Sequence, residues 1–340
     1  MKHILVIRLS AMGDVAMTVP VIRALTQQND SIKITFLTRS FFSPFFNEFS
    51  NVSIFSPDLK GRHKGLLGLF KLFKDLSKLK IDVVADLHNV LRSNIVVGLF
   101  KLTGTPCVQL NKGRKEKKEL TKPVIGKSLL PLNPMHNRYV DVFKKLGFIL
   151  DLTKKIFPEK SEIPSSIFNQ LKGKKLIGLA PFATYKSKSL PIKNIKELIH
   201  QINLKTDATV LLFGGGEKEK LILEGIADDS ENVISLVKKI SFEDELKLIS
   251  NLDVMIAMDS GNGHIAAMYG IPVITIWGMT HPSLGFSPFN QPFKNQILPD
   301  LKKYPLIPTS VYGNKYPQEY LTCFDTISIN GIVKLLNEYL

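Results

Sequence analysis

The chain has 340 residues, which is enough for two domains of ordinary size with separate hydrophobic cores. Its 44% hydrophobic and 22% charged residues are typical of a soluble globular protein, and no segment has the ~18 unbroken apolar residues of a membrane span. The formal net charge of +15 indicates an anionic partner, but zinc-finger spacing and an aromatic-basic RNA-binding consensus are both missing, which argues against nucleic acid.

Cysteine usage and the amino terminus set two further expectations. Cys107 and Cys323 have no partner cysteines at metal-binding spacing, so neither a disulfide framework nor a zinc site is expected. The first apolar stretch is too short for a signal peptide, which favours a cytoplasmic protein. An anionic lipid or a phosphorylated glycan then becomes the favoured partner for the positive charge.

In the first half of the chain, buried strands alternate with helices. Apolar runs predict strands at residues 2–9, 31–38, 52–55 and 81–87. Helical spacing predicts helices from about Thr18, at residues 66–79 and at residues 135–148. This alternation predicts a parallel sheet with helices on both faces.

Two basic regions interrupt that half. Residues 60–80 contain an amphipathic helix with an apolar stripe of Leu66, Phe70, Phe73, Leu76 and Leu79 and with lysines off this stripe. The simplest interpretation is a core-facing helix with a solvated lysine face. The alternative is a patch that binds a membrane surface or the acceptor. Residues 111–127 show no apolar periodicity and are expected to form a mobile loop.

A polar, proline-bearing stretch at residues 151–166 is the predicted linker, and a second alternation follows it. Strands are predicted at residues 175–179, 209–213, 253–258 and 272–277, with helices at 192–205, 219–227 and 242–250, after residue 264, and at 328–340 with Ser328 as cap. Residues 282–306 are expected to form a long ordered loop near the site. The predicted domains are residues 1–160 and 161–325, followed by a carboxyl-terminal helix at 326–340.

Polar turns follow several of the predicted strands, at residues 10–14, 181–188, 214–219 and 259–264. Open parallel sheets bind ligands at the carboxyl ends of their strands. Gly261 and Gly263 carry no side chain that would keep an anion from the backbone N–H groups, so the last turn is suited to phosphate. Two doubly wound halves that open their strand ends onto a shared cleft form the architecture called GT-B.

Several motifs occur in order along nearly the whole chain and together resemble one family. They are RLSAMGD at residues 8–14, DLH at 86–88 with Arg92-Ser93, Arg138-Tyr139, KSLP at 188–191, GGxxE at 215–219, DSGxxH at 259–264 and WGxTxP at 277–282. With these motifs the chain resembles the heptosyltransferases of glycosyltransferase family 9. Leu190 stands where the family usually has tryptophan.

The resemblance implies an α/β protein of the GT-B class, with two Rossmann-like doubly wound domains that face a central cleft. It also implies transfer of heptose from ADP-heptose to the inner core of lipopolysaccharide, without a metal. By resemblance Asp14 is the general base and Asp259 lies near the donor sugar.

The same chemistry can be argued from the residues. Transfer from a nucleotide diphosphate needs a base near the acceptor hydroxyl, and positive charge or N–H donors at the departing diphosphate. Asp14 and Lys188 could supply these groups, and the absence of an Asp-x-Asp motif at a strand end speaks against a metal. Attack from the face opposite the nucleotide would invert the anomeric configuration.

Simpler interpretations stay open at this stage. Asp14 could cap a helix, Asp259 could be a structural carboxylate, and His264 could be a buried hydrogen-bonding histidine. Lys188 could be a solvated lysine, in which case Lys186 would replace it. Besides heptosyl transfer, the alternatives are a family member that uses another nucleotide sugar, a sugar epimerase of related architecture, or a catalytically silent glycan-binding protein.

The expected site residues fall into three groups. The catalytic residue is Asp14; the donor-binding residues are Thr184, Lys188, Gly215, Gly216, Glu219, Asp259, Ser260, Gly261, Gly263 and His264; and the acceptor-binding residues are Arg62, His88, Arg92 and Arg138. No metal ligand and no cofactor are expected. The expected partners are a nucleotide sugar, an anionic lipid-linked glycan and the inner face of the cytoplasmic membrane, to which the protein would bind peripherally.

Overall fold

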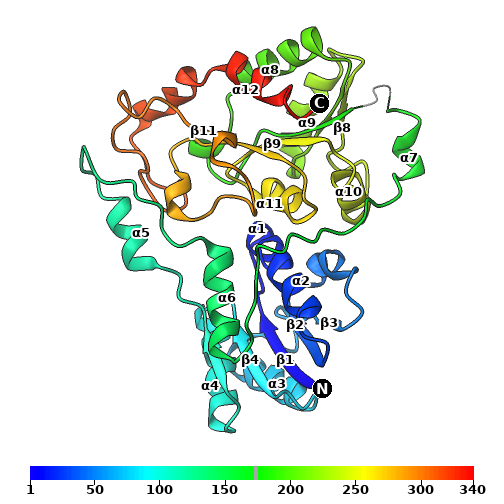
Figure 1. Ribbon diagram of the computed structural model, residues 1–340, viewed down its shortest axis with the longest axis vertical. Helices are drawn as coiled ribbons and strands as arrows, with labels where there is room; N and C mark the ends of the chain where they lie inside the picture. The colour runs from blue at the N-terminus through cyan, green and yellow to red at the C-terminus, as the bar shows by residue number, and fades with distance from the viewer. Residues whose placement is uncertain (172–174) are drawn as a thin grey trace. The chain divides into compact units, whose positions relative to one another are not determined.

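The computed structural model describes residues 1–171 and 175–340, and the chain forms two compact units (Figure 1). Unit 1 consists of Met1–Gly113 and Met135–Ile156, and unit 2 of Arg114–Pro134 and Phe157–Leu340. The chain therefore leaves unit 1 at Gly113, returns at Met135 and leaves again after Ile156.

Unit 1 is built on a parallel sheet in the order β3-β2-β1-β4-β5. The central strand β1 is completely buried from Ile4 to Ile7, as expected for a parallel strand covered on both faces. Its neighbours pair with it in parallel, so Ile7 lies opposite both Leu37 and Asp86. The strands are β1 Lys2–Ile7, β2 Ile32–Leu37, β3 Val52–Phe55, β4 Val83–Asp86 and β5 Cys107–Gln109.

Helices cover both faces of this sheet. Leu5 and Ile7 point to the face that carries α3 and α4, where they pack with Leu69, Leu72 and Phe100. On the other face α2 packs against α6, and Figure 1 shows this pair in front of the sheet. The helices of unit 1 are α1 Met12–Ala16, α2 Val19–Gln27, η1 Ser40–Phe46, α3 Gly65–Ser77, α4 Leu91–Leu102 and α6 Met135–Lys145.

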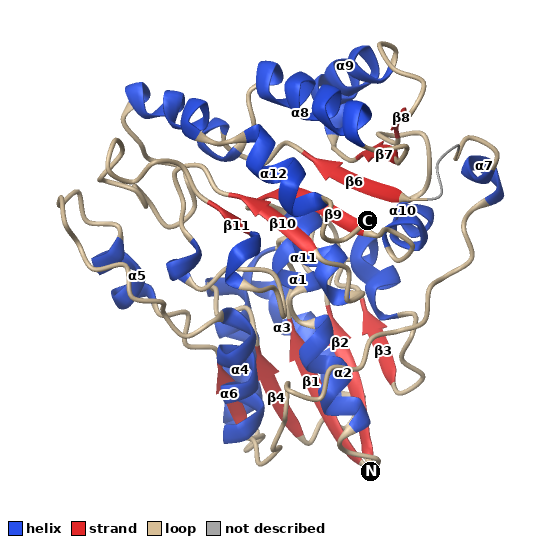
Figure 2. Cartoon of the chain, turned by 45° about the horizontal axis from the view of Figure 1, so that its top comes forward, coloured by secondary structure: helices blue, strands red, loops and turns tan. Residues whose placement is uncertain are grey.

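Unit 2 repeats this plan with the strand order β11-β10-β9-β6-β7-β8, and its strands are again paired in parallel (Figure 2). Ile177 and Leu179 of β6 share one buried core with the apolar residues of α8, α9 and α12. The strands are β6 Leu176–Ala180, β7 Thr209–Leu212, β8 Val233–Ser235, β9 Val254–Met258, β10 Val273–Ile276 and β11 Gln296–Ile297.

The helices predicted for unit 2 lie close to their expected positions, and the short helix α7 at Ser165–Phe168 was not predicted. The last helix of unit 2 packs against α8, and its cap is Ser328, whose side chain accepts a hydrogen bond from the Gly331 N–H at 3.0 Å. The helices are α7 Ser165–Phe168, η2 Lys186–Lys188, α8 Ile192–Lys205, α9 Gly216–Ala227, α10 Phe242–Ile249, α11 Gly261–Met268, η3 Pro282–Leu284, η4 Phe293–Asn295, η5 Gln318–Thr326 and α12 Ile329–Leu336.

The basic region at residues 111–127, predicted to be a mobile loop, is instead anchored as part of the segment 114–134. This segment begins with the helix α5 Arg114–Leu120, and Lys117 is buried with its ammonium group 3.8 Å from the centre of the Phe286 ring. Further along, the Leu132 N–H donates to the Ser283 carbonyl at 2.9 Å. These contacts explain why the segment belongs to unit 2, although the predicted first domain of residues 1–160 includes it.

Within the two described ranges, every helix is too short or too polar to cross a membrane.

Candidate functional site

The first cluster of polar side chains lies where β1 and β4 end in unit 1. These strands are neighbours and parallel, so the residues that follow them meet at one edge of the sheet. Arg8 comes directly after β1, and His88 follows β4 by two residues. The sequence thus brings together the groups around Asp14, which lies in the short helix α1.

Asp14 is held by two neighbours. Its carboxylate forms an ion pair with the Arg8 guanidinium and accepts a hydrogen bond from the Ala11 N–H at 3.3 Å. The Arg8 side chain is buried, whereas 29% of the Asp14 side chain is exposed. The carboxylate is therefore fixed on one side and open to solvent on the other. The contact with the Ala11 N–H agrees with the helix-capping interpretation of Asp14. This contact leaves the exposed side of the carboxylate available for chemistry.

Arg8 is surrounded by groups that stabilise its charge. Its Nη1 donates to the Leu87 carbonyl at 2.7 Å, so it ties the loop after β4 to Asp14. Burial alone would lower the pKa of Arg8, but Tyr139, Asp14 and Asp86 outweigh burial and raise it. The Tyr139 hydroxyl donates to the Asp14 carbonyl at 3.4 Å.

Asp86 organises the loop that carries His88. Its buried carboxylate accepts the backbone N–H groups of His88 and Asn89, each at 2.9 Å. It also accepts the Ser93 hydroxyl and the Gln109 side-chain amide, again at 2.9 Å. A carboxylate with this many donors fixes the backbone around it.

His88 is neutral at physiological pH. Burial, with a smaller contribution from the charges of Arg8 and Lys112, lowers the pKa of His88 to about 4. As a candidate for acceptor binding it offers hydrogen bonds but no positive charge, and the buried Arg8 supplies a positive charge beside it.

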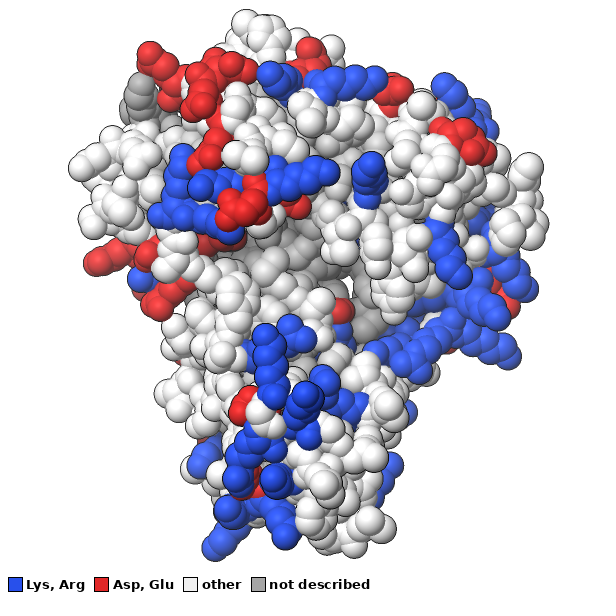
Figure 3. Space-filling view, turned by 180° about the vertical axis from the view of Figure 1, so that it is seen from behind, with Lys and Arg blue, Asp and Glu red and all other residues white. Residues whose placement is uncertain are grey.

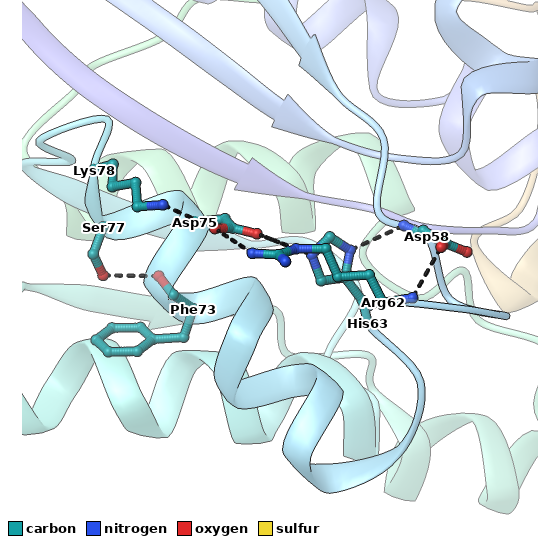
Figure 4. A network of polar contacts seen from close by, with 7 residues as sticks. All are labelled: Asp58, Arg62, His63, Phe73, Asp75, Ser77 and Lys78. Carbon is teal, nitrogen blue, oxygen red and sulfur yellow. Dashed lines mark hydrogen bonds and ion pairs between the residues drawn. The ribbon is translucent and has the colours of Figure 1, made fainter.

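The arginines expected to bind the acceptor are in different surroundings. Arg62 donates from Nε and Nη2 to the Asp75 carboxylate at 2.9 and 3.0 Å, in the network of Asp58, His63 and Lys78 shown in Figure 4. Arg138 is buried, and its Nη1 donates to the Asn111 carbonyl at 3.4 Å. Arg92 is exposed in the first turn of α4. Arg62 and Arg138 therefore already have structural partners.

The second cluster lies in unit 2, where β9 ends between β6 and β10. The Lys188 ammonium group is 2.9 Å from Asp259 Oδ2, and the Thr280 hydroxyl donates to the same oxygen at 2.8 Å. The side chains of Lys188 and Asp259 are 14% and 9% exposed. The contact of Lys188 with Asp259 rules out the interpretation of Lys188 as an ordinary solvated lysine.

Close backbone packing holds the loop that carries Lys188. The Met279 N–H donates to the Ser187 carbonyl at 3.0 Å, and the Ser187 hydroxyl donates to the Gly313 carbonyl. A Cβ at Gly278 would lie 2.1 Å from the Ser187 carbonyl oxygen, so only glycine fits at this position.

The turn after β9 opens α11 as predicted. Ser260 is the N-cap of α11, and its hydroxyl oxygen is buried without a hydrogen bond to any described residue. Gly261, Gly263 and His264 form the first turns of this helix. His264 is buried, in agreement with the structural interpretation from the sequence.

The glycine turn at the start of α9 is held by a residue of its own helix. The Glu219 carboxylate accepts the Gly215 N–H at 2.7 Å, so in this structure it caps its own helix. Gly216 has a φ of +77°, a conformation that favours glycine. Thr184 is exposed in the loop after β6.

Among the described residues, no group of three or more His, Cys, Asp or Glu side chains is arranged to hold a metal ion.

Comparison with known proteins gives the family. Residues 69–305 match the family model described as glycosyltransferase family 9 (heptosyltransferase). The chain belongs to glycosyltransferase family 9.

Similar proteins cover nearly the whole chain. Lipopolysaccharide heptosyltransferase 1 of Campylobacter coli is 24% identical, with 98% of each chain covered. Among solved structures, a family 9 glycosyltransferase from Veillonella parvula is similar with a TM-score of 0.73 and 18% identity, and it covers 99% of this chain and 97% of that one. E. coli heptosyltransferase WaaC with ADP follows with a TM-score of 0.68 and 18% identity, covering 99% and 100%.

These similarities confirm the predicted family and the fold class of two Rossmann-like α/β units in a GT-B protein. As a family 9 member the chain is a glycosyltransferase, as predicted.

Three residues of the two clusters were not selected from the sequence, although each lies in a quoted motif. Arg8 directly follows β1, Asp86 is the last residue of β4, and Thr280 lies four residues after β10. Their position at strand ends was a usable signal, because polar residues that follow buried strands gather at the ligand-binding edge of a parallel sheet.

Proposed function

We propose that this glycosyltransferase transfers heptose from ADP-heptose to an acidic, lipid-linked sugar of the lipopolysaccharide inner core, with inversion and without a metal ion. The main supporting observation is the half-open Asp14 carboxylate, held by Arg8 at the end of β1. The choice of sugar and acceptor rests on the relatives, which are named heptosyltransferases of lipopolysaccharide or lipooligosaccharide.

In this proposal Asp14 acts as the general base. It accepts the proton of the acceptor hydroxyl as that oxygen bonds to the anomeric carbon, while the bond from this carbon to the β-phosphate oxygen breaks and ADP leaves. Attack opposite the leaving group inverts the anomeric configuration. The buried Arg8 keeps the carboxylate in one orientation and compensates its charge before the proton arrives.

The donor side is assigned to unit 2. The departing diphosphate needs positive charge and hydrogen-bond donors, which Lys188, the Ser260 hydroxyl and the first N–H groups of α11 offer. Lys188 is paired with Asp259 here, so the diphosphate would compete with Asp259 for the ammonium group or add to the pair. A lysine and backbone amides take the role that Mg²⁺ has in other transferases.

We place the reaction at the cytoplasmic face of the inner membrane, with the protein bound peripherally. This assignment follows from the lipid-linked acceptor, and the net charge of +15 supports it because that membrane surface is anionic.

A donor panel tests the proposal. Purified protein is incubated with ADP-heptose, UDP-sugars and GDP-sugars, with and without EDTA, and the products are analysed by mass spectrometry and NMR. We expect transfer from ADP-heptose alone, unaffected by EDTA, with an inverted anomeric centre. Preferred use of a UDP-sugar would assign another family 9 activity, and loss of turnover in EDTA would refute metal independence.

The Asp14→Asn variant tests the base. We expect kcat to fall by roughly 10²–10⁴-fold, the usual contribution of a positioned base, while calorimetry shows unchanged ADP binding. Asp30→Asn, an exposed carboxylate before β2, is the matched control and should transfer normally. Unchanged transfer by Asp14→Asn, or a loss confined to nucleotide affinity, would show that Asp14 is not the base.

A further inference from the structure

The helix α3 Gly65–Ser77 presents an unusual surface to solvent. Its inner stripe of Leu69, Leu72 and Leu76 is buried in the core of unit 1. The predicted stripe was wrong at Leu66, Phe70 and Leu79, which are exposed because the helix is rotated. The outer arc of the helix begins with large apolar residues, of which Leu66 is 73%, Leu67 81% and Phe70 44% exposed. Three such neighbours on one helix end form an apolar patch, in contrast to the single exposed leucines common on protein surfaces.

The rest of the outer arc is cationic. Helical spacing places Lys71, Lys74 and Lys78 on the same side as the apolar patch, and Lys60 and Lys64 precede the helix. The Lys74 ammonium group lies 4.8 Å from the centre of the Phe70 ring, so charge and aromatic surface are in contact. Figure 3 looks onto the α3 and α4 face of unit 1, where Lys and Arg side chains gather with few carboxylates among them.

The acidic residues of this region, Asp75 and Asp58, are paired with neighbouring side chains or backbone N–H groups. Asp75, the single acidic residue of α3, pairs with Arg62, His63 and Lys78 (Figure 4). Asp58 accepts the backbone N–H groups of Gly61 and Arg62 at 2.8 and 2.9 Å. The hydrogen bonds of Arg62 and Asp58 fix the loop before α3, which holds the apolar patch in place.

We propose that the outer arc of α3 is a docking surface for an anionic lipid bilayer. Leu66, Leu67 and Phe70 enter the boundary between headgroups and acyl chains, while the lysines of α3 and of the loop before it contact lipid phosphates. Helices that lie in a membrane interface combine an apolar strip with lysines whose long stems reach back to the headgroups. The inference rests on the proposed function in one respect, because a lipid-linked acceptor requires the enzyme to work at a membrane.

Charge and apolar surface together favour a bilayer over other occupants. Nucleic acid or a soluble acidic glycan would use the lysines but would leave the adjacent Leu66 and Leu67 in water. A second copy of the chain would bring the same lysines against each other at a two-fold interface, where like charges repel.

Vesicle binding tests the proposal without any sugar substrate. The double variant Leu66→Gln/Leu67→Gln keeps good helix formers and removes the apolar patch. A second variant changes Lys60, Lys64, Lys71 and Lys74 to Gln. The control changes Leu204 and Leu221, which are 65% and 70% exposed on α8 and α9, to Gln.

Binding is measured by sedimentation with vesicles of phosphatidylethanolamine and phosphatidylglycerol, and with vesicles of phosphatidylcholine. The unchanged protein should prefer the anionic vesicles and lose affinity as salt rises. The Leu66→Gln/Leu67→Gln variant should bind at least about tenfold more weakly than the unchanged protein. The four-lysine variant should lose the preference for anionic lipid. The control should bind normally.

Several results would overturn the proposal. The Leu66→Gln/Leu67→Gln variant could bind vesicles as well as the unchanged protein does. The unchanged protein could bind both vesicle types with equal affinity at low salt. The unchanged protein could also self-associate through this surface, and the variant would then abolish the self-association. Transfer to a short, lipid-free acceptor is measured in parallel and should be normal in the variants. If the unchanged protein binds vesicles as described but transfers no heptose, the proposed function fails and the docking surface stands.

Discussion

Arg8 connects two loops through one buried guanidinium group. It donates to the Leu87 carbonyl at 2.7 Å on one side and pairs with Asp14 on the other. Arg8 makes these contacts with two different nitrogens of its planar fork, Nη1 and Nη2, and the single nitrogen of a lysine cannot occupy both positions. Arg8 is thus a positioning residue for the proposed base.

Replacing Arg8 with Lys should therefore reduce turnover more than substrate affinity. We expect kcat to fall by about 10–100-fold with little change in KM for the nucleotide sugar, since a misplaced base costs rate in the transition state. Steady-state kinetics measures both constants.

The matched control is Arg23→Lys, because Arg23 is also buried in unit 1 and makes a two-point contact with Glu48 at 2.9 and 2.7 Å. It should lower the melting temperature but leave kcat unchanged. If both variants lost turnover equally, Arg8 would have only a structural role.

The sequence predicts where the site residues lie along the chain better than it predicts their partners. Asp14 and Asp259 could be placed at strand ends because apolar runs mark the buried strands that precede them. The pairing of Lys188 with Asp259, and of Glu219 with the Gly215 N–H, depends on the direction of each side chain, which spacing does not encode.

At the scale of elements, the long apolar strands were predictable. The short strands β5, β8 and β11 and the helices α1, α4, α5 and α7 were not predicted. The run at residues 2–9 contains β1, and Val52–Phe55 agrees with its prediction at both ends. In α5, only Leu120 is an apolar anchor, and Lys117 is buried against the Phe286 ring far along the chain. Apolar periodicity cannot reveal a helix whose buried residue is a lysine.

The stability of segment 114–134 against local opening should depend on Lys127. The Lys127 ammonium group donates to the Leu306 and Pro308 carbonyls at 2.8 Å each and to the Lys122 carbonyl at 3.1 Å. Lys127→Met removes these charge-assisted bonds and leaves the carbonyls without that donor. We expect the free energy of local opening to fall by about 2–4 kcal/mol.

Hydrogen exchange of residues 114–134, or cleavage by thermolysin, measures the opening. Lys122→Met is the control, since Lys122 is exposed and its pair with Glu119 contributes little to stability. Equal exchange rates in the two variants would mean that Lys127 does not anchor the segment.

At the scale of the whole molecule, each unit has its own core and, among its buried histidines, one with a strongly lowered pKa next to a candidate functional loop. Burial lowers the pKa of His88 in unit 1 and of His281 in unit 2 to about 4, with a smaller contribution from Lys127 at His281. In the unfolded chain both would titrate near 6.5.

The stability contributed by these two histidines should therefore fall as the pH drops from about 6.5 to about 4, because at each of them the unfolded chain binds a proton in this window that the folded protein does not. Glu245, whose pKa burial raises to about 7, has the opposite effect in this window. Each histidine should contribute about 1–3 kcal/mol to this loss. Urea unfolding at several pH values measures it.

His88→Gln and His281→Gln should each reduce the slope of stability against pH, and the exposed His200→Gln should not. A double variant that keeps the full slope would show that these two histidines do not cause the acid sensitivity.

The length of the chain indicated two domains, and the linker predicted at residues 151–166 includes the final crossing after Ile156. The earlier excursion of residues 114–134 into unit 2 was not predictable, because it depends on tertiary contacts such as those of Lys127 with the carbonyls of Leu306 and Pro308.

The position of residues 114–134 in unit 2 affects the design of chimaeric proteins. A chimaera that exchanges the amino-terminal unit with a relative needs three splice points, after Gly113, after Pro134 and after Ile156. A single splice point near residue 160 would combine segment 114–134 of one protein with the unit 2 loops of another, where contacts such as those of Lys127 would be lost. Chimaeras spliced only there should therefore be mostly insoluble.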